Sequence, residues 1–257
     1  MARVLKALWM PVLQVAFVAA LIGVWYWGSR DGWLDTFVFG TPRETGGYLR
    51  TWFDDGTLWK SIWSTLKVLL VGWAIGMAFG VLLGCALGLS EFLRRVADPF
   101  LAFFNGMPRL ILYPFLAIWL GFELTSKVVF VALVIFVVVT TTVTAGFREV
   151  DRDLVANVRI LGGGIGPMIR DVYGPSLAIW VLSSARVTLG YAFQAAIAAE
   201  FIGASTGLGY LTVVGQEQLD VNQIWAALTV VVLLAWALDG AVALADRRLL
   251  RWMPAAR

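Results

Sequence analysis

Hydrophobic residues lie along this chain in six long runs, separated by shorter and more polar segments. Each run is about 20 to 25 residues long, and about 20 apolar residues in a helix span a hydrocarbon core of ~30 Å. The pattern therefore predicts an all-α integral membrane protein with about six transmembrane helices. The predicted spans are residues 9–28, 65–89, 99–120, 126–147, 177–201 and 223–245.

Composition strengthens this prediction and excludes several kinds of site. Hydrophobic residues make up 60% and charged residues 14% of the 257 residues, whereas a soluble domain is about 25% charged. The chain has no histidine and one cysteine, Cys85, so the commonest general base, the commonest metal ligand and any disulfide within the chain are missing. We find no pairing of a nucleophile with a base. We therefore expect neither enzyme activity nor a metal site.

Positive charges are unevenly distributed between the two sides of the predicted membrane. One side has Arg30, Arg43, Arg50, Lys60 and Lys127. The other has Arg3, Lys6, Arg94, Arg95, Arg148, Arg152, Arg159, Arg170, Arg247, Arg248, Arg251 and Arg257. Cytoplasmic loops are rich in lysine and arginine, so we expect the second side, with both termini, to face the cytoplasm. The first run ends in WYWGSRDGW without a small-residue cleavage site, which predicts a retained helix and not a signal peptide.

The longest segment on the outer side, residues 29–63, is polar and has four tryptophans. Its part LRTWFDDGTLWKSIW, residues 49–63, predicts an amphipathic helix in the membrane interface. The chain has 13 tryptophans. We interpret them as an aromatic belt in contact with membrane lipid, in preference to an aromatic cage for a substrate.

Glycines recur at every fourth residue in the second run: Gly72, Gly76, Gly80, Gly84 and Gly88. This spacing places them along one face of a helix. Because lipid tails are as apolar as the helices themselves, such a small-residue face favours close helix packing. The partner helix belongs either to the same chain, which we favour, or to a second copy.

The third and fourth runs contain residues that are unusual within a membrane helix. Pro99, Pro108 and Pro114 predict breaks or kinks in the third run, whose freed carbonyls must face protein or a water cavity. The fourth run contains TTTVT at residues 140–144. These hydroxyls either bond back to helix carbonyls in a packing surface or line a polar passage, and the sequence favours neither.

The segment VRILGGGIGPMIRDVYGP, residues 158–175, contains five glycines and two prolines. It does not fit a nucleotide-binding loop, since no lysine follows Lys127 and the dinucleotide pattern fails at Pro167. Apolar residues at helical spacing instead predict two short amphipathic helices joined by a glycine bend, with Pro167 in the first turn of the second helix. Such a cytoplasmic element is either a docking surface for a partner or an ordinary interfacial loop.

From Ala156 onward, this segment resembles the signature loop of ABC importer permeases. That loop reads E-A-A, three residues, glycine, nine residues and I-x-L-P. Gly162 takes the position of the glycine, Val172 that of the isoleucine and Pro175 that of the proline. The first three positions read A-N-V here, so the glutamate is replaced, and the leucine position is Gly174.

Two further blocks are similar to segments of the permeases for nitrate, sulfonates, taurine and related compounds. These permeases are binding-protein-dependent transport inner-membrane components. The two blocks are MPRLILYPFLAIWLGFELTSKV at 107–128 and ARVTLGYAFQAAIAAEFIGASTGLGYL at 185–211. The resemblance covers about residues 60–252. It implies a MetI-like type I importer permease core with a cytoplasmic coupling loop at about residues 148–175. The single transmembrane permease domain, residues 1–257, then divides into an N-terminal part, 1–60, and a permease core, 61–252.

The resemblance also implies partners. Two permeases, expected to be two copies of this chain although a related chain would also serve, assemble with two ABC ATPase subunits in the bacterial inner membrane. A periplasmic or lipid-anchored binding protein delivers the solute, and ATP and Mg²⁺ bind to the ATPase and not to this chain. No nucleic-acid partner is expected. The residues expected to couple to the ATPase are Leu154, Val158, Arg159, Leu161, Gly162, Ile165, Met168, Val172 and Pro175.

Polar residues inside the predicted spans are the candidates for the translocation pathway of a small anionic solute, because they must face protein or water. They are Asn105, Arg109, Thr140, Thr144, Arg186, Tyr191, Gln194 and Glu200. Arg109 and Arg186 would be the charge partners of the anion. Glu200 could instead pair with Arg109 or cap a kink as part of the framework. The alternative function is a proton-coupled secondary transporter that uses Glu200 or Asp239, although the sequence has no recognisable inverted repeat.

Overall fold

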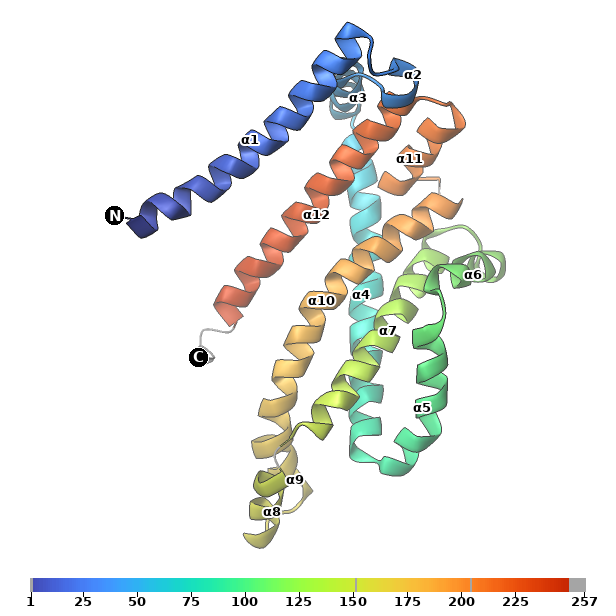
Figure 1. Ribbon diagram of the computed structural model, residues 1–257. Coiled ribbons are helices and arrows are strands. Elements are labelled where there is room, and N and C mark those ends of the chain that lie inside the picture. Colours follow the sequence, from blue (N-terminus) through green and yellow to red (C-terminus); the bar gives the residue numbers. More distant parts are fainter. Residues whose placement is uncertain (1, 151, 204, 250–257) are drawn as a thin grey trace.

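The computed structural model describes residues 2–150, 152–203 and 205–249, and it contains no strand among these residues, in agreement with the predicted all-α class (Figure 1). The first half of the chain forms α1 (Ala2–Asp31), α2 (Thr36–Phe39), α3 (Pro42–Asp54), α4 (Thr57–Leu89), α5 (Glu91–Gly106), the 3₁₀ turn η1 (Arg109–Ile111) and α6 (Leu112–Leu120). The second half forms α7 (Leu124–Arg148), α8 (Arg152–Ile160), α9 (Ile165–Pro167), the π-helix η2 (Met168–Tyr173), α10 (Gly174–Gly203), α11 (Leu208–Glu217) and α12 (Val221–Leu249).

Within the described residues, five segments are long and apolar enough to cross a membrane, and one bent pair of helices brings the number to six. Five predicted spans correspond to α1, α4, α7, α10 and α12. The third prediction, one span over residues 99–120, needs correction, because α5 and the η1–α6 segment meet at 89°. The break falls at Pro108, which has no amide hydrogen to continue the helix, whereas Pro99 lies inside α5.

The predicted interfacial helix over residues 49–63 is divided between α3 and α4. Gly56 separates the two helices, with a φ of 79° that favours glycine. Thr41 caps the start of α3, where its hydroxyl accepts a hydrogen bond from the N–H of Glu44 at 3.2 Å. α3 packs against α12, and the hydroxyl of Tyr48 donates a hydrogen bond to Asp220 just before α12. This hydrogen bond raises the pKa of Tyr48.

The glycine ridge of α4 packs against α7 of the same chain, which is the arrangement that we favoured. The four glycines from Gly72 to Gly84 are buried. A Cβ atom added at any of them would lie 2.6 or 2.7 Å from the nearest atom of α7, well inside van der Waals contact. The α7 residues that fill this space are Val131, Ala132, Ile135, Val139 and Val143. Because these four glycines have no side chain, α4 and α7 can approach each other closely.

Buried apolar side chains form two clusters that meet along α10 and α12. The larger cluster lies among α4, α6, α7 and α10 and includes Leu69, Tyr113 and Ile135. The smaller cluster joins α3, α11 and α12 around Trp52 and Leu208. The four-helix cluster is thus the frame on which the outer helices pack.

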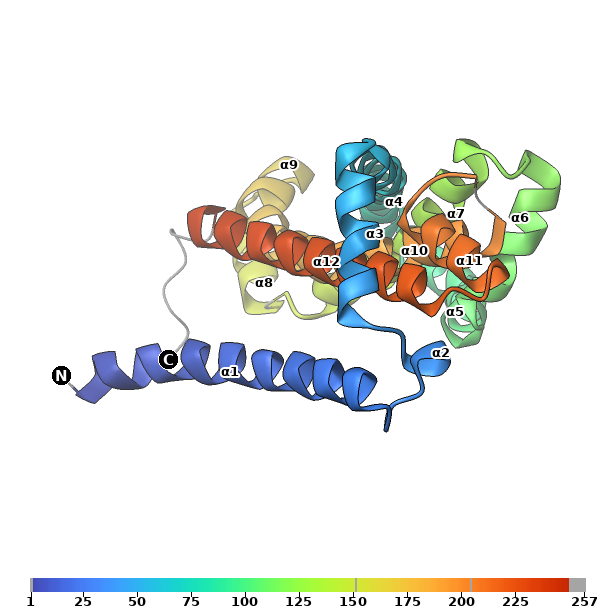
Figure 2. The same cartoon turned by 90° about the horizontal axis from the view of Figure 1, so that it is seen from above.

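α1 stands apart from the other helices (Figures 1 and 2). The contacts that hold it lie at its C-terminal end, where the indole N–H of Trp25 donates to the carbonyl of Phe39 at 3.1 Å. The ring of Trp25 also lies 5.5 Å from that of Trp225. The remaining described side chains of α1 are mostly exposed, as expected for a helix surrounded by lipid.

Candidate functional site

The loop between α7 and α10 projects from one end of the molecule (Figure 1). α8 ends in a glycine turn, in which Gly162 has a φ of 75° and the N–H of Gly163 donates to the carbonyl of Val158 at 2.8 Å. This bond across a left-handed glycine is the Schellman ending of a helix. An added Cβ at Gly162 would meet nothing within 4 Å. Gly162 is therefore required for its backbone conformation and not for space.

The tip of this loop is exposed and its base is buried. Ile160 and Leu161, at the turn, are 81% and 85% exposed. At the base, Val172 is only 5% exposed, and the ring of Tyr173 packs on Phe147 of α7 with centroids 5.2 Å apart. An apolar tip on an anchored base is the arrangement expected of an element that docks on a partner.

The predicted coupling residues divide between the tip and the base. The exposed ones are Leu154, Leu161, Gly162 and Pro175, and the half-buried ones are Val158 and Met168. Val172 belongs to the buried base, so it anchors the loop and is not free for contact with a partner. The side chains of Arg159 and Ile165 lie outside the part of the chain that the structure describes.

The second short helix predicted in this loop is not a separate element. α9 is three residues long, and η2 continues it without a break into α10. In this π-helix the N–H of Gly174 donates to the carbonyl of Ile169, five residues back. The wider register accommodates Pro175, which has no N–H to donate. α9, η2 and α10 therefore form one continuous helical segment.

α10 carries polar residues on an exposed face. Arg186, Tyr191 and Gln194 all lie on it. Arg186 and Gln194 line a cavity of about 340 Å³ between α10 and α12, together with Asp239 of α12. The structure thus brings together two predicted translocation residues and adds Asp239, which the sequence indicated only as a proton relay. Polar groups within a span must face protein or water, so this face requires a protein partner or an aqueous path.

Asn105 and Arg109 lie at the bend between α5 and η1. The guanidinium of Arg109 donates to the amide oxygen of Asn105 at 3.2 Å. Leu110 of the same bend lines a second cavity, of about 390 Å³, with Gln194 and Phe201 of α10. The broken third span and the exposed face of α10 therefore border each other.

Glu200 is fully buried near the C-terminal end of α10. Its two carboxylate oxygens lie 2.9 and 2.8 Å from the hydroxyl of Thr65 in α4, and one of them accepts the N–H of Gly209 at 3.0 Å. The N–H of Leu208 donates to the same hydroxyl at 3.0 Å. Of the two alternatives for Glu200, pairing with Arg109 or capping a kink, these contacts favour the second.

Thr140 and Thr144 lie in the interface between α4 and α7. Their hydroxyls donate to the carbonyls of Gly80 and Gly84 at 3.4 and 3.3 Å. The neighbouring Thr141 bonds back to carbonyls of its own helix. Neither Thr140 nor Thr144 lines the two cavities beside α10, but Thr144 lines a third cavity, of about 750 Å³, at the end that bears the coupling loop. This geometry favours a packing role for Thr140, whereas Thr144 packs against α4 and also borders a cavity.

Thr65 and Lys127 are among the buried polar residues that sequence reasoning missed. Thr65 is fully buried and is the main partner of Glu200, 135 positions away in the chain. Lys127, which we assigned to the outer surface, is only 4% exposed. No local pattern marks either residue.

Comparison with known proteins identifies similar sequences over most of the chain. Residues 76–251 match the family described as binding-protein-dependent transport system inner membrane component. The chain is 32% identical to a protein of Escherichia coli strain K12 named as an aliphatic sulfonates transport permease, SsuC, over 91% of this chain and 89% of that protein. It is 27% identical to the taurine transport system permease protein TauC of the same strain, over 93% and 89% of the two chains. It is 30% identical to the riboflavin transport system permease protein RibX of Chloroflexus aurantiacus, over 94% and 91%.

Solved structures share the fold. One is the inward-facing MetNI methionine ABC transporter, with a TM-score of 0.64 and 20% identity over 75% of this chain and 95% of that chain. Another is an amino acid ABC transporter with histidines, with a TM-score of 0.66 and 17% identity over 79% and 98%. The helical core thus has the MetI-like arrangement that the sequence predicted.

Proposed function

Because the chain belongs to the family of binding-protein-dependent transport system inner membrane components, we propose that its loop over residues 154–175 couples it to an ABC ATPase. The chain is a multi-pass inner-membrane permease of an ABC importer. The observation that supports coupling through this loop is the contrast between its exposed tip, Ile160 and Leu161, and its buried base. In this proposal a partner that covers the tip would move α10 through the glycine turn, α9 and η2, of which α9 and η2 run into α10 without a break.

In this proposal two copies of the chain assemble with two ATPase subunits. The ATPase subunits bind ATP and Mg²⁺ and carry out the hydrolysis, and this chain catalyses no reaction. A second copy is supported by the exposed polar face of α10, which needs protein or water beside it. The arginine-rich side, with the loop and both termini, faces the cytoplasm. A periplasmic or lipid-anchored binding protein delivers the solute from the opposite side.

The proposed solute is a small anion of the sulfonate type. Two relatives are named for aliphatic sulfonates and for taurine, and a sulfonate group is an anion. Arg186, Tyr191 and Gln194 offer a guanidinium, a hydroxyl and an amide along the exposed face of α10. Arg109 and Asn105 add a second donor group at the bend that borders this face.

A proton relay through Glu200 has no comparable support. Its carboxylate is fully buried and already accepts hydrogen bonds from Thr65 and Gly209. These contacts support a role for Glu200 in the framework that holds the turn after α10, and we pursue the importer.

The test is purification of the tagged protein in mild detergent from its native cells, with identification of every subunit that accompanies it. We expect a stoichiometric ABC ATPase, and we expect Leu161→Asp to lose it because a charge then occupies the apolar tip. The matched control is Phe37→Asp, at a residue that is 69% exposed in the outer segment, which should retain the ATPase. Retention of the ATPase by Leu161→Asp would contradict docking at the tip. Purification of the protein alone, with uptake driven by a proton gradient, would contradict the importer mechanism.

A further inference from the structure

The cavity of about 340 Å³ between α10 and α12 is lined by side chains of both charges, within the part of each helix that can span the membrane. On α10, Arg186, Gly190 and Gln194 line it at four-residue spacing, so they share one face of the helix. α12 contributes Asp239, and the other lining residues are apolar. One positive and one negative side chain therefore border the same space, and their formal charges cancel.

The carboxylate of Asp239 is not neutralised by its own chain. Asp239 is exposed, and the structure joins its carboxylate by a hydrogen bond or an ion pair to none of the residues that it describes. A charged side chain within a membrane span is unfavourable unless it faces water or a group of opposite charge. The side of the cavity formed by α12 is thus suited to a positively charged group from outside the chain.

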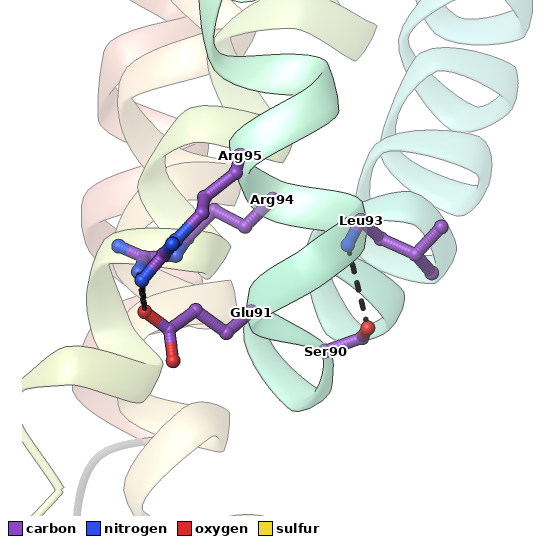
Figure 3. Close-up of polar contacts among 5 residues, drawn as sticks. All are labelled: Ser90, Glu91, Leu93, Arg94 and Arg95. Carbon is purple, nitrogen blue, oxygen red and sulfur yellow. Dashed lines mark hydrogen bonds and ion pairs between the residues drawn. The ribbon is translucent and has the colours of Figure 1, made fainter.

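The carboxylate beside the larger cavity, of about 750 Å³ at the end that bears the coupling loop, is in a different situation. Glu91 lines that cavity, and it accepts a hydrogen bond at 2.6 Å from Arg95 of the same helix (Figure 3). Arg94 lies 3.8 Å from it as well. The charge of Glu91 is therefore balanced within α5, whereas the charge of Asp239 is available to a ligand.

From this arrangement we propose that the transported solute is a zwitterion, with a sulfonate group bound to Arg186 and Gln194 and an ammonium group bound to Asp239. The guanidinium and the amide donate to the oxygens of an anion, and a carboxylate accepts from an ammonium group. A simple anion would instead be placed beside the negative charge of Asp239, and such a pairing of like charges opposes binding.

The size of the cavity agrees with a small solute of this kind. Its volume of about 340 Å³ lies at the lower end of the ~300–1,000 Å³ of small-molecule sites. The inference rests on the proposed importer and narrows its solute from a sulfonate in general to a sulfonate that also carries a positive charge.

The experiment measures equilibrium binding of two solutes to the detergent-purified transporter without its binding protein. The solutes are taurine, which carries an ammonium group, and ethanesulfonate, which lacks it. We expect the unmodified protein to bind taurine more tightly. Asp239→Asn should weaken taurine binding at least about tenfold, as expected for the loss of a hydrogen bond between charged groups, and should strengthen binding of ethanesulfonate. Arg186→Gln should weaken binding of both solutes. The matched control is Glu217→Gln, an exposed acidic residue outside the cavity, which should bind both like the unmodified protein.

The ratio of the two affinities in one sample does not depend on how much of a variant folds. If Asp239→Asn left this ratio unchanged, the carboxylate would have no role in recognition and the proposal would be overturned. Tighter binding of ethanesulfonate than of taurine by the unmodified protein would assign the cavity to a simple anion. Binding of neither solute would also overturn the proposal. Each of these results leaves the importer itself standing, since retention of the ATPase tests it separately.

Discussion

The glycine ridge of α4 and the glycine turn after α8 use the same residue for different reasons. In the ridge an added Cβ would lie 2.6 or 2.7 Å from an atom of α7, so the glycines are selected for space. At the turn Gly162 has open space around it, but its φ of 75° disfavours any other residue. The ridge thus fixes a rigid pair of helices within the membrane, while the turn fixes the direction of a protruding tip. Substitutions in the two regions should separate the stability of the frame from coupling to the ATPase.

The largest effect should come from filling the ridge. In Gly76→Leu the new Cβ would meet the carbonyl oxygen of Ala132 at 2.6 Å, and a backbone atom cannot move aside without shifting α7. We expect a loss of more than about 3 kcal/mol of stability, at the upper end of overpacking effects. The measurement is the midpoint of thermal unfolding in mild detergent. Gly23→Leu in α1, where nothing lies within 4 Å, is the control, and an equal loss in both variants would refute the role of the ridge.

Gly207 combines the two reasons for glycine, a positive φ and a lack of space for a side chain. Its φ is 118°, and an added Cβ would lie 2.2 Å from the buried carboxylate of Glu200. With ψ of 173° its backbone lies in a region that is essentially restricted to glycine. Gly207→Ala should therefore cost about 2–3 kcal/mol, from this backbone strain and from steric overlap. The same thermal midpoint measures it. A matched change is Gly56→Ala, which has φ of 79° and open space and should show the strain alone. If the two variants lost equal stability, the contact with Glu200 would carry no weight.

At the turn, Gly162→Val should cost only about 1–2 kcal/mol of stability, because strain is its only penalty. The tip would nevertheless point in a different direction. We therefore expect solute-stimulated ATPase activity of the assembled transporter to fall more than tenfold. Gly164→Val is the control, since Gly164 has neither a positive φ nor a neighbour within 4 Å. Normal stimulated activity in Gly162→Val, with the protein correctly inserted, would refute the turn as part of the coupling element.

Features that depend on residues close together in the sequence could be predicted, and features that depend on distant residues could not. The spans, the ridge of Gly72 to Gly84 and the turn at Gly162 all depend on spacing within one helix or one turn, and periodicity reports these directly. The bend at Pro108 was indicated by proline but its angle of 89° was not, because the packing of α6 on α7 sets it.

Contacts between distant segments left no trace in the sequence. No sequence pattern near Glu200 identifies Thr65 as its hydrogen-bond partner. No pattern near Arg186 predicts that Asp239 lines the same cavity. The continuous helix through Pro175 was also missed, because its π-type register depends on a single shifted hydrogen bond. The candidate site was thus predicted as a set of residues, and only the fold could divide it into coupling tip, α10 face and buried framework.

The smallest effect, and the one that decides between the two interpretations of the threonines, should come from Thr140→Val. Its hydroxyl donates across the helix pair to the carbonyl of Gly80 at 3.4 Å, and interhelical hydrogen bonds in membranes contribute about 0.6 kcal/mol on average. We expect a loss of that order, with the uptake rate of the assembled transporter unchanged, because Thr140 is fully buried away from the α10 face. Thr141→Val, which removes only bonds to its own helix, should lose less. A fall in uptake at unchanged stability in Thr140→Val would instead mean that the interface of α4 and α7 opens during transport, and the rigid frame would then be part of the moving pathway.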